Sequence, residues 1–363
     1  MPENRKIFFI LPVFKEGGAE KTLSTIMGGM VERGFNVTLV IIKDNISFPF
    51  PKNVETEVLE KKWMAWLPEI FKKAFYCRKI KSIVSKEEPM AVFASLPYAH
   101  KIVSRTGIAM GKLFFTVHNT PSSYLSSKPS KRVRDLRRLK AIYDGQNIVT
   151  ISEGVRDDMI TVGVLPKNIV TIYNPFDFDE IQEKASETIP GIPDEPFLVY
   201  PAHFYKRKRH DILIEALSLS GVKEKLVLLG SRGEMDAAKA LVEKKGLEDQ
   251  VIFAGWHANP YPWIKRAKLL VFASEQEGLG RALIESLVLG TPVVSTDCPS
   301  GPSEILTGTL KPFLVPVNDP HALAEKIKEA LREYPQITPA DTEKFEKEHV
   351  ISQYVALVLK ESE

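Results

Sequence analysis

Two glutamates, Glu277 and Glu285, are separated by seven residues in a short stretch that also holds two glycines. Gly278 and Gly280 flank Leu279, and the backbone N–H groups of such a loop can face a ligand anion at the start of a helix. Carboxylates accept hydrogen bonds from hydroxyl groups, while amides and the helix dipole bind phosphate. These residue types in this spacing suit a sugar nucleotide.

Local patterning predicts a strand, a turn and a helix around the two glutamates. The apolar run 268–273 predicts a buried strand, and the segment 282–289 predicts a helix that Gly290 ends. Glu277 then lies in the loop and Glu285 about one turn into the helix. The alternative is an ordinary strand–turn–helix whose two glutamates are only solvated.

This stretch resembles the donor site of the family-four glycosyltransferases of the GT-B fold, in which a glutamate, seven residues and a second glutamate recur. The resemblance implies an α/β fold with two doubly wound Rossmann-like domains that face a deep cleft. It also implies that Glu285 holds the nucleotide ribose and Glu277 the sugar hydroxyls. A retaining, metal-independent reaction is expected, without a cofactor and with the nucleotide sugar as co-substrate.

A basic run opens the second half of the chain. Lys208 stands where the family has a lysine, which implies a point charge that clamps the diphosphate and stabilises the leaving group. His203 stands where the family usually has an arginine, and histidine is at most partly charged near neutral pH. Either His203 makes a weaker phosphate contact or Arg207 or Arg209 replaces it. For Lys206 and Arg207, a solvated helix start is a reasonable alternative.

Two further resemblances lie in the first half. Gly17 and Gly18 open a helix and resemble the family loop near the donor diphosphate and acceptor, although a plain tight turn is the alternative. His118 follows the strand predicted at 113–117, and the resemblance implies that it contacts the donor sugar or positions the reacting groups. We therefore group His118 with Lys208 and Glu277 as catalytic candidates, against the alternative of a structural histidine.

Residues 251–256 are expected to line the nucleobase pocket, with Phe253 and Trp256 offering flat apolar faces. This assignment rests on the resemblance alone. We favour uracil over guanine because the relatives that look most similar use UDP-sugars. The loop 297–305 offers further amides at a helix start facing the same cleft.

The composition is that of a soluble two-domain protein: 363 residues, 44% hydrophobic, 26% charged and a net charge of +3. This balance gives no general attraction to nucleic acid, and no nucleic-acid-binding module is recognisable. The two cysteines, Cys77 and Cys298, suggest neither a disulfide framework nor a cysteine metal site, so a reducing, cytoplasmic compartment is expected. The apolar run 7–14 is too short to span a bilayer.

Apolar runs alternate with helical patterns along the whole chain, which predicts parallel sheets covered by helices. The proline-rich segment 187–196 is interpreted as the interdomain linker. An acceptor-binding domain is therefore expected at 1–186 and a nucleotide-sugar-binding domain at 187–341. The resemblance adds that the last helix, 342–363, crosses back onto the first domain.

Two segments of the first half are rich in basic residues, and residues 61–81 interleave them with aromatics. Tryptophan and basic residues together favour the headgroup layer of an anionic membrane. The residues expected to face it, from this segment and from 128–140, are Trp63, Trp66, Lys72, Lys73, Arg134 and Arg137. The alternative is that both helices pack on the sheet with solvated charges outside.

The combined interpretation is a glycosyltransferase of polysaccharide or lipopolysaccharide biosynthesis. It would move a hexose or N-acetylhexosamine from a nucleoside diphosphate to a lipid-linked or cell-surface glycan, at the inner face of the cytoplasmic membrane. One alternative is a transferase with a soluble acceptor, of the sucrose- or trehalose-synthase type. Another is a catalytically impaired sugar-nucleotide-binding partner of a glycan-assembly complex, which His203 alone favours.

Overall fold

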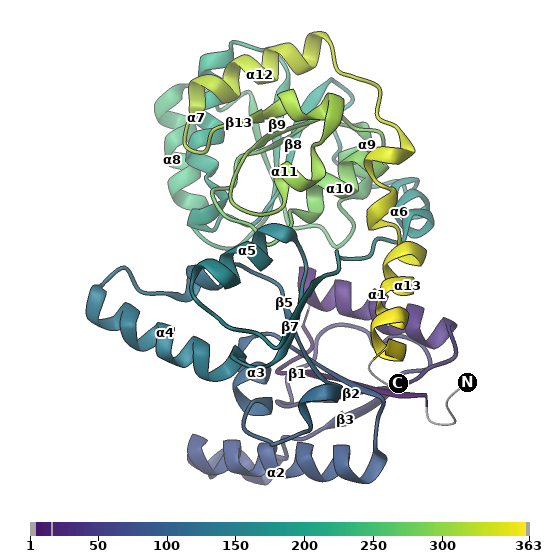
Figure 1. Cartoon of the computed structure of the whole chain (residues 1–363). Coiled ribbons are helices and arrows are strands. Elements are labelled where there is room, and N and C mark those ends of the chain that lie inside the picture. The colour runs from purple at the N-terminus through teal and green to yellow at the C-terminus, as the bar shows by residue number, and fades with distance from the viewer. Residues whose placement is uncertain (1–4, 16, 361–363) are drawn as a thin grey trace. The chain divides into compact units, whose positions relative to one another are not determined.

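The computed structural model describes residues 5–15 and 17–360 and divides into two compact units. The first unit comprises residues 1–175 and 347–363, and the second comprises residues 176–346. Each unit is built on one parallel sheet with helices packed around it (Figure 1). The predicted fold class, two doubly wound Rossmann-like domains, is confirmed.

The sheet of the first unit has the strand order β3-β2-β1-β4-β5-β6-β7, and every neighbouring pair is parallel. Its central strands are buried along their length, as expected where helices cover both faces. The strands are β1 (Lys6–Leu11), β2 (Asn36–Ile41), β3 (Glu55–Val58), β4 (Ala91–Ser95), β5 (Leu113–Val117), β6 (Asn147–Thr150) and β7 (Asn168–Thr171).

Six α-helices belong to the described part of this unit: α1 (Gly18–Glu32), α2 (Glu69–Glu87), α3 (Pro97–Val103), α4 (Pro129–Tyr143), α5 (Glu153–Thr161) and α13 (Lys347–Lys360). Short 3-10 turns occur at η1 (Lys62–Trp66), η2 (Met110–Lys112) and η3 (Pro121–Tyr124). Helices α1 and α13 lie side by side and share one hydrophobic core with β1 and β2, whereas α4 extends away from the sheet (Figure 1).

The sheet of the second unit has the order β10-β9-β8-β11-β12-β13, again all parallel. Its strands are β8 (Phe197–Pro201), β9 (Lys225–Leu229), β10 (Val251–Gly255), β11 (Leu269–Phe272), β12 (Val293–Thr296) and β13 (Leu314–Val315). The strand order reverses between β8 and β11, and ligands of such sheets bind at the carboxyl ends of the strands at this switch point.

The helices of the second unit are α6 (Phe178–Ala185), α7 (His210–Ser220), α8 (Met235–Lys245), α9 (Tyr261–Arg266), α10 (Arg281–Val288), α11 (Pro302–Ile305) and α12 (Pro320–Arg332). Its 3-10 turns are η4 (Lys206–Lys208), η5 (Gly308–Phe313), η6 (Pro339–Asp341) and η7 (Glu343–Phe345). Helix α10 begins at the predicted turn and ends just before Gly290, as the local pattern required.

The boundary between the units differs from the predicted one at 186/187. The first unit ends at Pro175, and α6 belongs to the second unit because it packs against α9 and α10. The proline-rich segment 187–196 is therefore a loop within the second unit and not the linker. Proline and glycine mark any turn, so composition could not distinguish a surface loop from a domain connection.

The C-terminal segment also differs in detail. The helix expected over 342–363 is α13, and the turns η6 and η7 precede it within the second unit. Its apolar residues Val350, Tyr354 and Val358 are buried in the core of the first unit. The chain thus leaves the first unit after Pro175 and returns at Lys347, so that two segments connect the units.

Candidate functional site

The loops that follow β8, β11 and β12 carry most of the predicted site residues of the second unit. These strands are neighbours in the order β8-β11-β12, so their carboxyl ends meet at one edge of the sheet. The loop after β11, residues 273–280, holds Glu277 and the two glycines and leads directly into α10. We call it the glutamate loop.

Lys208 and Glu277 meet in this region. The Lys208 Nζ forms a close ion pair with Glu277 Oε1, and the two side chains are 16% and 9% exposed. The ammonium group also lies 5.4 Å from the centroid of the Phe272 ring at the end of β11. Two residues that are 69 positions apart in the sequence are thereby brought together as an ion pair.

A buried tyrosine that sequence reasoning missed fixes the lysine. The Tyr200 hydroxyl donates to the Lys208 carbonyl at 2.9 Å and shares a 3.0 Å hydrogen bond with Ser274 Oγ. Thr296 of β12 donates in turn to the Ser274 carbonyl at 2.5 Å. Burial raises the pKa of Tyr200 well above its usual value, so its hydroxyl stays protonated. The sequence signal for Tyr200 was a side chain with a hydroxyl near the end of the otherwise apolar strand β8.

Glu285 lies one turn into α10 and is 8% exposed. Its Oε1 accepts from Arg281 Nη2 at 3.2 Å and from the Tyr261 hydroxyl at 3.4 Å. Both donors were missed, although Arg281 precedes Glu285 by one helical turn. Glu277 and Glu285 are therefore mostly buried and paired with basic groups, which excludes the alternative of two merely solvated glutamates.

The loop after β12 supports the glutamate loop from below. The Ser300 hydroxyl lies 2.8 Å from the Glu277 carbonyl oxygen and 3.2 Å from the Gly278 carbonyl oxygen, and it can donate to either. A Cβ atom on Gly301 would lie 2.0 Å from the Leu279 carbonyl oxygen, and its φ of +97° is one that favours glycine. The loop predicted at 297–305 thus positions the backbone of the glutamate loop.

His203 lies partly buried after β8. The Ser231 amide faces its Nδ1 at 3.4 Å. Burial is the main cause that lowers the pKa of His203, and the charges of Arg232 and Lys208 lower it further. The imidazole is therefore neutral near pH 7, unlike the arginine that it replaces.

The two predicted nucleobase residues have different surroundings. Phe253 of β10 stacks on Phe204 with ring centroids 5.9 Å apart, and Lys239 of α8 lies 5.7 Å above its ring. Trp256 follows β10 and is 46% exposed. Phe253 is thus part of the packing between β10 and the loop after β8, while Trp256 retains a free face.

The predicted residues of the first unit lie at the carboxyl ends of its strands. Gly17 and Gly18 are exposed at the start of α1, where Gly17 is in an extended conformation. His118 follows β5, and its buried Nε2 has no hydrogen-bond partner among the residues that the structure describes. Burial lowers the pKa of His118 to about 4, so the ring is neutral.

A second histidine near this strand end was not predicted. His100 of α3 is 1% exposed, and its Nε2 lies 3.0 Å from the Ala94 carbonyl, which can only accept. Nε2 must then carry the proton, and Nδ1 accepts from the Tyr143 hydroxyl at 2.7 Å. Burial lowers the pKa of His100 to about 3. Two neutral histidines thus flank the ends of β4 and β5.

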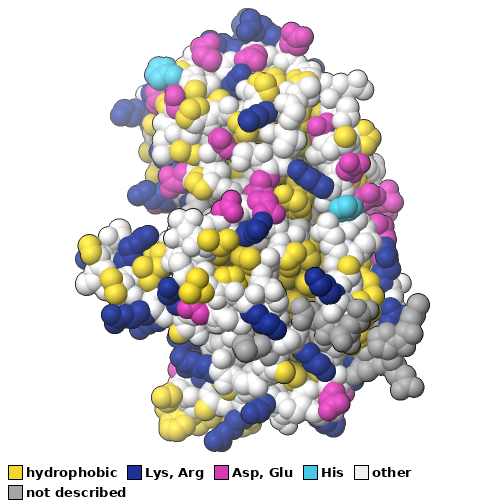
Figure 2. All heavy atoms as spheres, viewed as in Figure 1, with side chains coloured by type: hydrophobic (Ala, Val, Ile, Leu, Met, Phe, Trp, Pro, Cys, Tyr) yellow, Lys and Arg dark blue, Asp and Glu magenta, His cyan; other side chains and the backbone are white. Residues whose placement is uncertain are grey.

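Four large hydrophobic side chains are exposed around the start of α2. Trp66 is 92% exposed, Ile70 73%, Phe71 61% and Trp63 60%. Figure 2 shows hydrophobic and basic side chains close together over α2. None of the described helices is long and apolar enough to cross a bilayer.

The predicted membrane-facing cations divide into three kinds. Arg134 and Arg137 are exposed on α4, and Lys73 is half-buried. The prediction is wrong for Lys72, whose side chain is only 16% exposed and lies 3.7 Å from Glu60. Helical spacing turned Lys72 toward Glu60, which the short strand β3 brings close.

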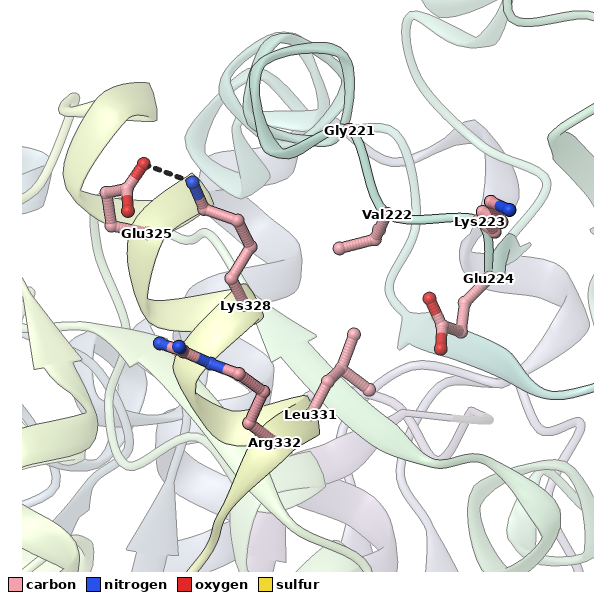
Figure 3. A pocket seen from close by; sticks show the side chains of 8 residues that line it. All are labelled: Gly221, Val222, Lys223, Glu224, Glu325, Lys328, Leu331 and Arg332. Atoms are coloured by element: carbon pink, nitrogen blue, oxygen red, sulfur yellow. Dashed lines mark hydrogen bonds and ion pairs between the residues drawn. The ribbon is translucent and has the colours of Figure 1, made fainter.

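A hollow of about 620 Å³ lies elsewhere in the second unit, between the end of α7 and α12 (Figure 3). Lys328 points to Glu325 there, while Val222 and Leu331 point into the hollow. None of the predicted site residues lines it. Within residues 5–15 and 17–360, no three metal-binding side chains gather into a candidate metal site.

Two family models together match nearly the whole chain. The model described as Glycosyltransferase Family 4 matches residues 16–180, and the model described as Glycosyl transferases group 1 matches residues 182–349. Each model corresponds closely to one half of the fold, and their junction falls near the observed boundary.

Curated relatives align over most of their length. The N-acetylgalactosamine-N,N'-diacetylbacillosaminyl-diphospho-undecaprenol 4-alpha-N-acetylgalactosaminyltransferase of Campylobacter jejuni is 26% identical over 329 residues, 87% of each chain. The lipopolysaccharide core biosynthesis glycosyltransferase LpsE of Rhizobium meliloti is 24% identical over 319 residues, 87% of this chain and 86% of that protein. Both names describe glycosyltransferases, the first of a diphospho-undecaprenol-linked sugar and the second of lipopolysaccharide core biosynthesis.

Among solved structures, HepE of Anabaena in complex with UDP and glucose superposes with a TM-score of 0.78 at 18% identity. The match covers 98% of this chain and 100% of that chain. At this identity the likeness supports the fold.

Proposed function

This chain belongs to family four of the GT-B glycosyltransferases and acts in glycan assembly, and we propose that its donor is a nucleoside-diphosphate sugar, with UDP favoured. The acceptor would be a lipid-linked or cell-surface glycan, of the kind that the names of the relatives describe. One observation carries the proposal. Lys208, Glu277 and Glu285 are positioned at the carboxyl ends of β8 and β11, the switch point where nucleotides bind in such sheets.

Each of the three residues has a distinct role in this proposal. Lys208 would bind the diphosphate and neutralise the negative charge that grows on it as the sugar leaves. Glu277, which Lys208 and the Ser300 loop hold in place, would accept hydrogen bonds from the sugar hydroxyls. Glu285 would accept those of the ribose. Gly278, Leu279 and Gly280 would offer backbone amides to the diphosphate.

The stereochemical proposal is retention, with the diphosphate leaving on the face that the acceptor hydroxyl attacks. His118, neutral at its strand end, would hold the donor sugar, and Gly17 and Gly18 would let the ligand approach the backbone of the first unit. We propose that Lys208 supplies the positive charge without a metal. Unchanged turnover in excess EDTA is the expected result.

A screen of UDP-, GDP- and ADP-sugars by binding and hydrolysis tests the proposed function. We expect UDP-sugars to bind and turn over. Glu277→Ala and Glu285→Ala should each weaken transfer about tenfold to a hundredfold, which corresponds to the loss of one charged hydrogen bond. Unchanged kinetics in both variants would refute the donor-site assignment. Glu275→Ala, in the same loop but on a half-exposed carboxylate paired with Arg209, is the matched control.

His203 keeps a second candidate open, a sugar-nucleotide-binding partner without turnover. Its neutral ring offers the diphosphate less charge than the usual arginine. If the protein is active, His203→Arg should be tolerated or activating. Tight donor binding without turnover in both proteins would favour the binding partner, and activity on a water-soluble acceptor alone would favour a soluble-acceptor transferase.

We further propose that the first unit docks on the inner face of the cytoplasmic membrane. The apolar–basic patch, consisting of Lys61, Lys62, Trp63, Trp66, Ile70 and Phe71, combines exposed apolar side chains with exposed cations. Apolar side chains can enter the headgroup region, and each nearby lysine adds about 1 kcal/mol at an anionic surface. Arg134 and Arg137 on α4 would add to this attraction.

Sedimentation with phosphatidylglycerol vesicles tests the docking. We expect binding at low salt that weakens as salt screens the charges, and blue-shifted tryptophan fluorescence. The double variant Trp66→Ser, Ile70→Ser should lose binding. Leu165→Ser removes a side chain that is also exposed (69%) but lies outside the patch, and it should bind normally. Equal binding of all three proteins would exclude this patch.

A further inference from the structure

Arg281 occupies an unusual position for a basic residue. It is the first residue of α10, directly after Gly280, which has a φ of +92°. Cations are unfavourable at the positive end of a helix, and a basic residue four positions before an acid is the weaker orientation for an ion pair. Helix stability therefore does not explain Arg281.

The contacts of Arg281 explain it better. Its guanidinium lies 4.3 Å from the centroid of the Phe176 ring, and its Nη2 donates to Glu285 Oε1 at 3.2 Å. Its side chain is 17% exposed and that of Glu285 is 11% exposed. A planar guanidinium stacked on an aromatic ring has few alternative rotamers, so the carboxylate that it bonds is also fixed.

Both supports of this arrangement are anchored. Phe176 is 1% exposed, donates its N–H to the Phe345 carbonyl at 2.8 Å and packs edge-on against the Phe345 ring. Tyr261, also 1% exposed, bonds Glu285 from α9, and its own N–H donates to Asn259 Oδ1 at 3.1 Å. Two different elements therefore hold the same oxygen of Glu285.

We propose that Arg281 is the positioning residue of the ribose-binding carboxylate. Arg281 and Tyr261 both donate to Glu285 Oε1, and in this proposal Oε2 is the oxygen that faces the ribose. A carboxylate oxygen has two acceptor positions, so Oε2 presents both to the vicinal hydroxyls of a ribose. This inference rests on the proposed role of Glu285.

The preference for a ribonucleotide over its dideoxy form tests the inference, because a purely structural role of Arg281 would leave this preference unchanged. Calorimetry compares UDP with 2′,3′-dideoxyuridine diphosphate, which lacks both hydroxyls. The same comparison is made for the guanosine and adenosine diphosphates and their dideoxy forms. The preference for the ribonucleotide is then measured with the base that the wild-type protein binds most tightly. The wild-type protein should prefer the ribonucleotide about tenfold to a hundredfold, and Glu285→Ala should bind both forms almost equally.

The variants of Arg281 then test the inference. Arg281→Met should lose the preference by weakening ribonucleotide binding, with the dideoxy form bound within about threefold of wild type. Arg281→Lys keeps the charge without the planar stack and should recover part of the preference, and Tyr261→Phe should reduce it. Arg266→Met, which removes a half-exposed arginine from α9, is the matched control and should keep the full preference.

The outcomes separate the two levels of the proposal. Suppose that Glu285→Ala loses the preference for the ribonucleotide, while Arg281→Met and Arg281→Lys keep it or weaken the binding of both nucleotide forms equally. The positioning role of Arg281 is then overturned, and the donor site stands. If Glu285→Ala keeps the preference, the ribose role of Glu285 is wrong and this inference falls with it. Thermal unfolding of each variant identifies a loss that comes from misfolding.

Discussion

Single side chains in this protein act through the partners that the fold gives them. Lys208 is paired with Glu277, and Tyr200 holds its backbone, so the ammonium group is fixed at the site that we propose for the diphosphate. His100 and His118 are kept neutral by burial. The position of Lys208 and the neutral state of the two histidines therefore follow from the surroundings that the fold creates.

Lys208→Met should lower turnover more than it weakens donor binding. The charge on the diphosphate grows as the glycosidic bond breaks, so a cation there stabilises the transition state more than the ground state. We expect kcat to fall about 100- to 1,000-fold, with a smaller rise in KM, in steady-state assays. Lys206→Met, in the same 3-10 turn but exposed, is the control. A rise in KM at constant kcat would show that Lys208 only binds.

His100 should make the first unit less stable in mild acid. Its pKa is about 3 when folded, against roughly 6.5 when unfolded, so the unfolded chain binds the extra proton between these values. The contribution is complete above pH ~6.5 and is lost as the pH falls toward 3, about 2 kcal/mol at pH 5. Urea unfolding measures the free energy of unfolding at pH 7.5 and at pH 5. Between these pH values it should decline less in His100→Gln than in the wild-type protein, by about this amount. An identical decline would contradict the assignment.

At the scale of elements, close approach of helices and loops depends on particular glycines. A Cβ atom on Gly29 of α1 would lie 2.5 Å from Ile351 Cγ1 of α13, whereas one on Gly28 would meet nothing within 4 Å. In the second unit, Gly301 has the same role where its loop contacts Leu279. These positions set how tightly the elements that carry the site can pack.

Adjacent glycines of α1 provide a matched pair of substitutions. Gly28→Ala should stabilise the first unit by about 0.5–1 kcal/mol, because alanine is the better helix former. Gly29→Ala gains the same propensity but forces α13 away, with an overpacking cost of about 1–3 kcal/mol. Denaturant unfolding should therefore give Gly29→Ala a lower free energy of unfolding than Gly28→Ala. Equal stability of the two would mean that Ile351 moves aside freely.

At the scale of the whole molecule, the chain crosses between the units twice, and its last helix belongs to the first unit. Each unit has its own hydrophobic core, so unfolding need not be a single transition. The proposed donor residues Lys208, Glu277 and Glu285 all belong to the second unit. Loss of the first unit should therefore spare nucleotide binding.

Ending the chain after Glu346 should separate the two units in stability. It removes Val350, Ile351, Tyr354 and Val358, each at most 1% exposed. Their burial contributes about 1.5–3 kcal/mol each, a sum comparable with the stability of a domain. Hydrogen exchange should show β1 and β2 unprotected while UDP still binds. Leu359→Ala, on the exposed side of α13, should change neither property.

The sequence by itself determined the local features. Alternating apolar runs and helical patterns predicted parallel sheets covered by helices, and the strand predicted at 113–117 is β5 with the same bounds. The strand–turn–helix that carries Glu277 and Glu285 was predicted because strand burial, helix periodicity and a terminating glycine are encoded within about twenty consecutive residues.

Only the tertiary structure decided what those residues touch. The edge strands β3 and β7 consist of exposed and partly buried residues, and they were not predicted. They are strands because they pair with β2 and β6, and no buried apolar run marks them in the sequence. The pairing of Lys72 with Glu60, the ion pair of Lys208 with Glu277 and the stacking of Arg281 on Phe176 all join separate segments. Sequence patterns report periodicity along one segment, whereas the chemistry of this site depends on how loops from different strands meet at one edge of a sheet.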